Sequence, residues 1–359
     1  MSAASINREQ VDGALKTIAD PETGRPLWQL DQIRNISVHG NEIEITIALT
    51  SYSAPLWQDT REHIIEHLQS SLPDKPTVKV EIVPLDRPAE PIGGIGLTAK
   101  SVIAVGSGKG GVGKSTIAVA LACGLQQSGC KVGLLDADVY GPSVPHLLGT
   151  TERPVATDKK LQPIDVQGLK MMSMGLIVPP GEAVVWRGPM LHGAITQFLR
   201  DTNWGDLDYL IIDMPPGTGD ISLTLSQLIP LTGAVIVCTP QDVALLDAVK
   251  AVAMFNKVNI PILGVVENMS YFLCPDNGKR YDIFGSGGAR RKAEELGVPF
   301  LGEVPIQIKI RERGDAGDSF GNFADQEAAP HFQRICYSLT KNLAMQKAVN
   351  PPLPSLSVL

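Results

Sequence analysis

The sequence predicts an α/β protein with a mostly parallel sheet that carries helices on both faces, preceded by a small α+β domain. From residue 101 onward, short apolar runs alternate with helix-sized segments, as in parallel strands that are joined by helices. A stretch rich in proline and glycine at 84–99 separates this part from the first 83 residues. We therefore expect domains at 1–83 and 100–349, a linker at 84–99 and a flexible tail at 350–359.

The first domain is expected to fold in the order αββαβ. Asn7 and Gln10 have the spacing of a capping box at the start of a helix. Alternating apolar residues predict strands at 33–38 and 42–49, joined as a hairpin. A second helix over 54–71 and a third strand over 78–83 complete the domain.

The second domain contains five short apolar runs, each of which predicts a buried strand. A helix over 115–125 follows the first of them, and a last helix is expected over 325–349. The carboxyl ends of parallel strands are where ligands bind in open α/β sheets, so the site is expected at that edge. The five runs are 101–105, 131–135, 207–212, 234–238 and 262–266.

A phosphate-binding loop follows the first of these strands. Gly108, Gly113, Lys114 and Ser115 fit the pattern G-x-x-x-x-G-K-[ST]. In this pattern backbone N–H groups surround phosphate oxygens, the lysine reaches the β- and γ-phosphates, and the hydroxyl of Ser115 binds Mg²⁺. The residues expected to bind the nucleotide here are Gly108, Gly110, Gly111, Val112, Gly113, Lys114, Ser115 and Thr116.

Three aspartates are expected at the same edge of the sheet. Asp136 and Asp138 end the second strand and Asp213 ends the third, so Asp136 and Asp213 are predicted to hold Mg²⁺. Asp138 is predicted to orient the attacking water, because it lies in a glycine- and proline-containing segment. Asn268 follows the strand at 262–266 and is placed to hydrogen-bond an adenine edge.

The composition argues against several classes of partner. A net charge of −7 argues against nucleic acid or an anionic membrane as a main partner. The apolar runs are too short to cross a bilayer, and the polar start predicts no secretory signal. Five cysteines without a disulfide-like spacing indicate a reducing compartment, so a cytoplasmic protein is expected. Cys123, Cys238 and Cys336 are expected to be buried and structural.

The combined motifs carry a resemblance to a known family. The sequence K-G-G-V-G-K-S-T with D-A-D and D-x-P-P-G is similar to the deviant Walker A ATPases, which include MinD and ParA. Within that group, "GPSVP" (141–145), "MPPGTGD" (214–220) and "ENMSYF" (267–272) resemble the Mrp/ApbC iron–sulfur carrier proteins, relatives of the Nbp-type scaffolds. The first domain, with its "DPETG", resembles the SufT/PaaD-type assembly domain.

The resemblance implies an ATPase that works as a homodimer. Lys109 would reach the phosphates of the partner subunit, and its charge would have the role of an arginine finger. The dimer would hold a [4Fe–4S] cluster through Cys274 and pass it to apo iron–sulfur proteins. ATP and Mg²⁺ are the other expected cofactors, and cluster assembly factors are expected partners.

The sequence departs from the family pattern at two positions. The family has a C-x-x-C after "ENMSYF", whereas here Cys274 is followed by Asn277, so two subunits supply two thiolates where a cluster normally has four. Asp276 or an external thiol such as glutathione are candidates for the remaining ligands. In the first domain, relatives often carry a cysteine before proline, whereas this chain has Ser53-Ala54-Pro55, which favours a docking role for that domain.

Two other functions stay open at this point. One is a spatial-organisation ATPase of the MinD/ParA kind, which needs a basic amphipathic helix or a basic surface. The other is a nucleotide-gated scaffold or metallochaperone that has lost the cluster together with the second cysteine.

Overall fold

The computed structural model describes residues 6–92, 96–157, 160–176 and 188–349. The chain divides into two compact units, and each is described separately. Unit 1 comprises residues 1–87 together with 340–359, and unit 2 comprises residues 88–339. The predicted tail at 350–359 lies outside the described residues.

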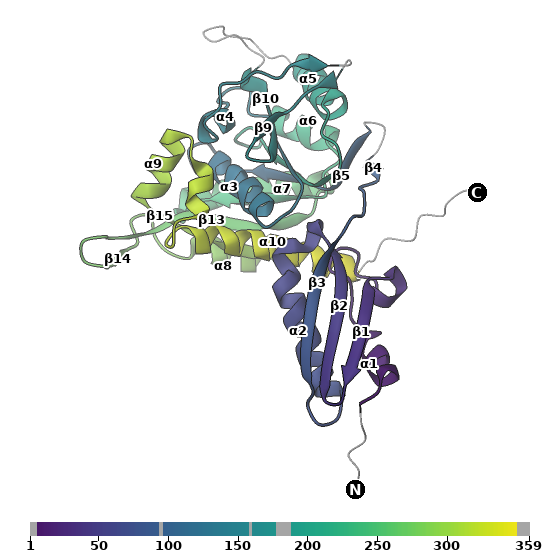
Figure 1. Ribbon diagram of the computed structural model, residues 1–359. Helices are drawn as coiled ribbons and strands as arrows, with labels where there is room; N and C mark the ends of the chain where they lie inside the picture. The colour runs from purple at the N-terminus through teal and green to yellow at the C-terminus, as the bar shows by residue number, and fades with distance from the viewer. Residues whose placement is uncertain (1–5, 93–95, 158–159, 177–187, 350–359) are drawn as a thin grey trace. The chain divides into compact units, whose positions relative to one another are not determined.

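Unit 1 is a three-stranded sheet packed against two helices (Figure 1). Strand β2 lies in the centre, antiparallel to β1 and parallel to β3. The order αββαβ is as predicted, and Asn7 and Gln10 form the expected capping box. The elements are α1 (Arg8–Leu15), η1 (Leu27–Leu30), β1 (Ile33–His39), β2 (Glu42–Thr50), η2 (Ser51–Leu56), α2 (Trp57–Ser71) and β3 (Thr77–Leu85).

The core of unit 1 follows from the alternation along β2. Ile43, Ile45, Ile47 and Leu49 are buried, whereas Glu42 and Glu44, which alternate with the first two, are exposed. The second helix begins at 57 instead of the expected 54, because residues 51–56 form a tighter 3-10 turn around Pro55.

The end of the last helix packs into unit 1. A Cβ atom on Gly24 would lie 2.6 Å from the carbonyl oxygen of Lys347, so the turn at 20–25 touches this helix directly. The Nζ of Lys347 lies 4.1 Å from the centre of the Tyr52 ring. The helix, α10 (Ala329–Val349), therefore contributes to both units, whereas the sequence placed all of it in the second domain.

Unit 2 contains a ten-stranded sheet in the order β14-β13-β12-β5-β11-β6-β10-β9, with β15 beside β13 and β4 beside β5. Strands β10, β6, β11, β5, β12, β13 and β15 pair in parallel, which confirms the predicted mostly parallel sheet. The strands are β4 (Pro91–Ile92), β5 (Leu97–Gly106), β6 (Val132–Asp136), β9 (Ile164–Val166), β10 (Leu169–Ser173), β11 (Leu207–Asp213), β12 (Gly233–Cys238), β13 (Ile262–Leu273), β14 (Arg280–Tyr281) and β15 (Phe300–Ile306).

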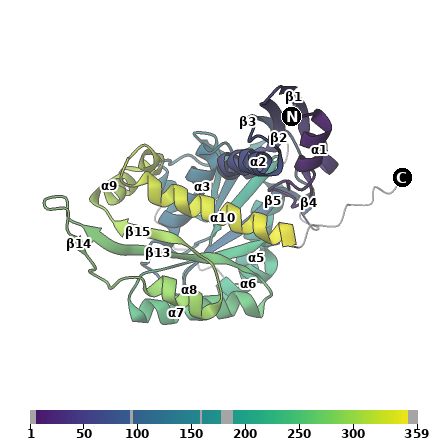
Figure 2. The ribbon, with the colours of Figure 1, turned by 90° about the horizontal axis from the view of Figure 1, so that it is seen from below.

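Helices cover both faces of this sheet. Figure 2 shows α3 and α10 on one side of the sheet and α7 and α8 on the other, as predicted. On the face with α3 and α10, these two helices touch each other, where Cys336 of α10 lies against Gly124 of α3. The helices are α3 (Lys114–Gln127), α4 (Val144–Leu147), α5 (Gly188–Asp201), α6 (Asp220–Leu228), α7 (Asp242–Lys257), α8 (Gly288–Leu296) and α9 (Ile308–Ala316), with short 3-10 turns η4 (Met174–Leu176) and η5 (Ser319–Phe323); β7 (Ala156–Thr157) and β8 (Lys160–Leu161) form a separate hairpin.

Two strands are longer than the sequence predicted. The strand before the glycine loop begins at Leu97, and β4 pairs with its first residues, so the expected linker is partly ordered as sheet. Strand β13 was expected to end at 266 but continues to Leu273. It continues through an irregular stretch, where Met269 has a φ of 54° and the pairing register with β15 shifts.

Within the described residues, no helix combines the length and the apolar character needed to cross a membrane.

Candidate functional site

The glycine loop connects the end of β5 to the start of α3. Gly111 and Gly113 have φ values of 80° and 81°, which glycine adopts without strain. A Cβ on Gly108 would lie 2.1 Å from the backbone oxygen of Asp247 in α7. A Cβ on Gly113 would lie 2.1 Å from Nδ2 of Asn268. These positions therefore require glycine, and the first N–H groups of α3 lie at the end of the loop.

Three hydrogen bonds hold the loop in place. The hydroxyl of Ser107 donates to the carbonyl of Lys109 over 2.9 Å. The backbone N–H of Gly217, in the loop after β11, donates to the carbonyl of Ser107, also over 2.9 Å. The side-chain amide of Asn268 donates to the carbonyl of Val112 over 2.9 Å. Hydrogen bonds within the chain thus connect the glycine loop to the segment after β11 and to β13.

A cavity of about 320 Å³ lies over this loop. Most of the residues predicted to bind nucleotide line it. Its lining consists of Ser107, Lys109, Gly110, Gly111, Gly113, Lys114, Ser115, Thr116, Asp138, Gly141, Ser143, Leu147 and Pro216. The other residues predicted for the nucleotide site are not part of this lining: Gly108, Val112, Asp136, Asp213 and Asn268.

Lys114 lies between two carboxylates. Its Nζ is 2.6 Å from Oδ1 of Asp213 and 3.7 Å from Oδ2 of Asp138. Asp213 is fully buried, and its Oδ2 has no partner among the described residues. Burial raises the pKa of Asp213, and the charge of Lys114 opposes that rise. A buried carboxylate oxygen without a donor, beside the hydroxyl of Ser115, is chemically suited to the water shell of Mg²⁺.

Asp136 organises the segment that follows β6. Its Oδ1 accepts from the N–H of Asp138 over 3.1 Å, and its Oδ2 accepts from the N–H of Val144 and the hydroxyl of Ser173 over 3.3 and 2.9 Å. Burial raises the pKa of Asp136 to about 7, and the nearby Asp213 carboxylate adds to the rise. Both carboxylate oxygens are therefore already engaged in holding the chain between 136 and 144.

Asp138 presents one carboxylate oxygen to the cavity. Its Oδ1 accepts from the N–H groups of Tyr140 and Gly141 over 3.3 and 3.2 Å. Its Oδ2 faces the ammonium of Lys114. The first contact fixes the orientation of the carboxylate, and the second places it where it can polarise a water near the phosphates.

Asn268 belongs to β13 and not to a loop after the strand. Its amide nitrogen is bonded to the glycine loop, and the residue is buried. The sequence did not reveal the contact of Asn268 with Val112. The amide of Asn268 also lies so close to Gly113 that position 113 has no room for a side chain. A role of Asn268 in base binding stays a prediction.

Cys274 lies one residue beyond β13, at the tip of a hairpin formed with β14. Phe272 pairs with Tyr281 and Leu273 with Arg280. The N–H of Cys274 donates to the carbonyl of Lys279 over 2.9 Å, and the side chain is half-buried. Within the described residues, no cluster of three or more histidine, cysteine or acidic side chains has the geometry of a metal site.

Asn277, at the position of the missing cysteine, has a structural role. Its Oδ1 accepts from the N–H of Lys279 over 2.9 Å, which closes the turn of the hairpin. Nearer the start of β13, the carboxylate of Glu267 accepts from the N–H of Ala289 over 2.7 Å at the start of α8. The turn of the hairpin around Cys274 is therefore held by hydrogen bonds of the chain itself.

The remaining cysteines are buried. Burial raises the pKa of Cys238 and of Cys336 to about 12, and it raises the pKa of Cys123 as well. Cys130 is also buried, at 5% exposure, and burial raises its pKa. Thiols with raised pKa values are poor ligands and nucleophiles at neutral pH.

Unit 1 contains a buried polar cluster that the sequence did not reveal. The guanidinium of Arg87 lies 3.1 Å from Oδ2 of Asp20 and 3.6 Å from Oε2 of Glu22. Glu22 also accepts from the hydroxyl of Thr50, and Asp20 from the amide of Gln32. The "DPETG" motif, residues 20–24, supplies both carboxylates. Ser53 is buried beside this cluster, where its hydroxyl donates to the carbonyl of Thr50.

Comparison with known families decides the identity of the chain. A model described as "NUBPL iron-transfer P-loop NTPase" matches residues 98–340, and one described as "Iron-sulfur cluster assembly protein" matches residues 8–82. The chain belongs to the NUBPL iron-transfer P-loop NTPase family. The predicted resemblance to the Mrp/ApbC and Nbp-type carriers, with an assembly-type N-terminal domain, is confirmed.

Individual proteins are similar to this chain over most of its length. The "Iron-sulfur cluster carrier protein" of Deinococcus radiodurans is 49% identical over 306 residues, which cover 85% of this chain and 86% of that protein. The protein of the same name from Synechocystis is 47% identical, over 87% of this chain and 90% of that protein. A nucleotide-binding protein of Archaeoglobus fulgidus, solved in complex with ADP, is 41% identical with a TM-score of 0.56, covering 62% of this chain and 88% of that one.

Proposed function

We propose that this protein is an ATP-hydrolysing carrier that holds a [4Fe–4S] cluster between two copies of the chain and transfers it to apo iron–sulfur proteins in the cytoplasm. The names of the similar proteins support the cargo. The observation that carries the proposal is the course of β13. This strand contacts the glycine loop through Asn268 and ends one residue before Cys274. A change at the phosphates is thereby transmitted along one strand to the cluster ligand.

The proposed roles in hydrolysis follow from the positions around the cavity. The backbone of 108–116 and the ammonium of Lys114 bind the phosphates, and Asp138 orients the attacking water. Asp213 and the hydroxyl of Ser115 would hold Mg²⁺ through its water shell, with Asp136 supporting that shell from behind. When bound, the metal neutralises charge on the phosphate oxygens.

Lys109 has a separate proposed role. It lines the cavity, it is half-buried, and it makes no ion pair within the described part of the chain. A cation that is not needed by its own subunit can serve the phosphates of a second copy. We assign to Lys109 the neutralisation of charge on the γ-phosphoryl group of the partner subunit.

Two copies of Cys274 supply two thiolates to the cluster in this proposal. The remaining ligands come from Asp276 or from a small thiol such as glutathione. A [4Fe–4S] cluster with incomplete protein ligation is exposed to exchange, which is suited to transfer. Unit 1, which has Ser53-Ala54-Pro55 where relatives often carry a cysteine before proline, is proposed to dock assembly factors or recipients.

One observation favours a second candidate. Asn277 closes the hairpin turn through its own hydrogen bond, so the turn does not depend on a metal. A nucleotide-gated scaffold or metallochaperone without a cluster would retain this same geometry.

Anaerobic reconstitution with iron and sulfide separates the two candidates. We expect wild type to bind iron and sulfide and to absorb near 400 nm, and Cys274→Ala to lose both. Cys130→Ala is the matched control, because its thiol is buried and should not be needed. Iron-free protein in every case would contradict the carrier, and ATPase activity in those samples would then favour the scaffold.

A further inference from the structure

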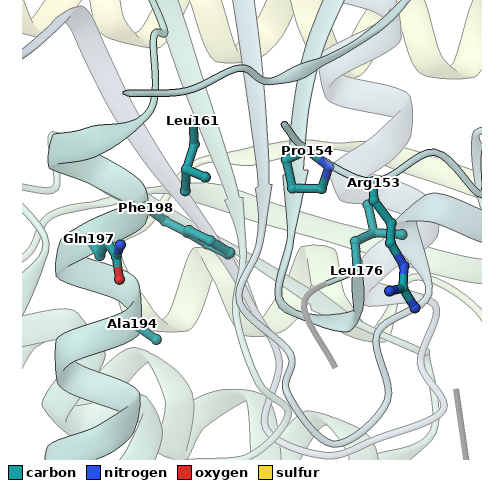
Figure 3. Close-up of a pocket in the computed structure, with 7 residues that line it drawn as sticks. All are labelled: Arg153, Pro154, Leu161, Leu176, Ala194, Gln197 and Phe198. Carbon is teal, nitrogen blue, oxygen red and sulfur yellow. The ribbon is translucent and has the colours of Figure 1, made fainter. Parts of the chain in front are cut away.

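Two cavities of unit 2 are not used by the proposed mechanism. The larger, of about 440 Å³, lies between α5 and the side chains of Arg153, Pro154, Leu161 and Leu176. Figure 3 shows the ring of Phe198 pointing from α5 into this cavity, with Arg153 on the opposite side. The second cavity, of about 370 Å³, is lined by Pro142, Pro145 and His146. Arg153 and Leu176 line both cavities, so together they form one groove.

The chemistry of the groove is apolar with a basic centre. Phe198, Leu161 and Pro154 provide the walls at one end, and the prolines provide them at the other. The titratable side chains in the lining are Arg153 and His146, and no carboxylate of the described residues lines the groove. Arg153 is exposed and has no ion pair within the described ranges. The groove thus offers a cation between two apolar hollows.

One wall of the groove is shared with the nucleotide cavity. Gly141, Ser143 and Leu147 line the nucleotide cavity, and the residues between them, Pro142, Pro145 and His146, line the groove. The carboxylates of Asp138 and Asp136 bind the N–H groups of Gly141 and Val144 in this wall. A ligand that engages Asp138 therefore acts on a segment whose other side forms the groove.

We propose that this groove binds an extended peptide segment of a recipient protein, in which an acidic residue lies between apolar residues. The apolar side chains enter the two hollows, and the carboxylate pairs with Arg153 at their junction. Because the wall at 141–147 is shared, the nucleotide changes the affinity for the peptide. The nature of the partner rests on the proposed carrier function, whereas the groove and its chemistry do not.

Selection from a random peptide library tests this proposal. A phage-displayed library of twelve-residue peptides is selected on the full chain and depleted on the variant Arg153→Glu. Enriched peptides are then made with a fluorescein label, and their binding is measured by anisotropy. We expect an acidic residue flanked by apolar residues, and a loss of affinity of about tenfold or more in Arg153→Glu. Exchange of the acidic residue for lysine should restore binding to that variant.

Three controls make the result specific. Arg334→Glu makes the same charge change on an exposed arginine outside the groove and should leave binding unchanged. Ala194→Trp fills the larger cavity from α5 and should abolish binding, with circular dichroism to show that the fold is retained. Cys274→Ala should bind the peptide normally, so a failure of the cluster experiment and a failure of this one are distinguishable.

Several outcomes would overturn the proposal. Enriched peptides without an acidic residue, or equal binding to Arg153→Glu, would remove the role of Arg153. Displacement of the peptide by dodecanoate, with saturable dodecanoate binding of its own, would identify the groove as a site for a small apolar acid. Equal peptide affinity with ADP and with a non-hydrolysable ATP analogue would refute the link through 141–147.

Discussion

The ammonium of Lys114 lies 2.6 Å from Oδ1 of Asp213, and both groups are buried at the end of the central strands. One side chain begins α3 and the other ends β11, so the pair joins the glycine loop to the neighbouring strand. The same ammonium is the group that we propose to bind the β- and γ-phosphates. It therefore neutralises a buried carboxylate and is also available to a nucleotide.

Replacing Lys114 with methionine should abolish nucleotide binding and destabilise the fold. Without the ammonium, the buried Asp213 carboxylate is uncompensated, at a cost of about 3–5 kcal/mol. The double variant Lys114→Met/Asp213→Asn should regain most of the stability without regaining binding. Urea unfolding and fluorescent-ADP titration measure the two effects, and equal stability of the single and double variants would contradict this account of the pair.

Asp138→Asn should bind ATP but hydrolyse it slowly. The amide oxygen can still accept from the N–H groups of Tyr140 and Gly141, so the segment should keep its position. The loss of the carboxylate removes the general base, which lowers kcat by about 10²–10⁴-fold with little change in KM. A rise in KM with unchanged kcat would show that Asp138 contributes to binding instead.

Lys109→Ala should retain ATP binding and lose turnover, since its proposed target is the partner's nucleotide. A mixture of Lys109→Ala and Lys114→Ala subunits tests this directly. In a mixed dimer, the Lys114→Ala subunit cannot bind ATP but supplies Lys109 to the other site, so activity should reappear. Activity no greater than the sum of the separate variants would place Lys109 in its own subunit's site.

The stability of the protein should depend on pH through Asp136. Its pKa is about 7 in the folded chain, which is above the value of about 3.9 expected when unfolded. The stability that its protonated form contributes is present below about pH 4 and is lost as the pH rises through 7. Asparagine at position 136 does not titrate, so Asp136→Asn lacks this pH dependence. The free energy of unfolding of the variant minus that of wild type, measured with urea, should therefore increase from pH 5 to pH 7.5. A constant difference would mean that the carboxyl titrates normally.

Cys274 should be the fast-reacting thiol of the native protein. It is half-exposed, and the four other cysteines are buried, with pKa values raised by burial. Reaction with a chromogenic disulfide should give about one rapid equivalent in wild type and none in Cys274→Ala. Two rapid equivalents would show that one buried thiol is accessible through local opening, and urea-denatured protein provides the total count.

The sequence predicted the fold well because the signals that define it are local. The apolar strands from 101 onward and the glycines at 108 and 113 are read from composition and spacing alone. The order of elements in unit 1 follows in the same way from the alternation around Ile43 and Ile45.

What the sequence could not supply is the pairing of distant residues. The contact of Asn268 with Val112 and the bond from Gly217 to Ser107 join segments that are far apart in the chain. Asp136 and Asp138 both follow the same apolar strand in the sequence. Only the structure shows that Asp136 accepts hydrogen bonds from the backbone, whereas Asp138 lines the cavity. The polar cluster of Asp20 and Arg87 was missed for the same reason.

The contact of Gly24 with Lys347 also has a consequence during synthesis. The helix end that covers the turn at 20–25 and the ring of Tyr52 is made by the ribosome long after the other elements of unit 1. The first unit therefore cannot complete its packing until residue 349 has emerged from the exit tunnel. Until then, the nascent chain carries an N-terminal unit that lacks part of its own surface cover.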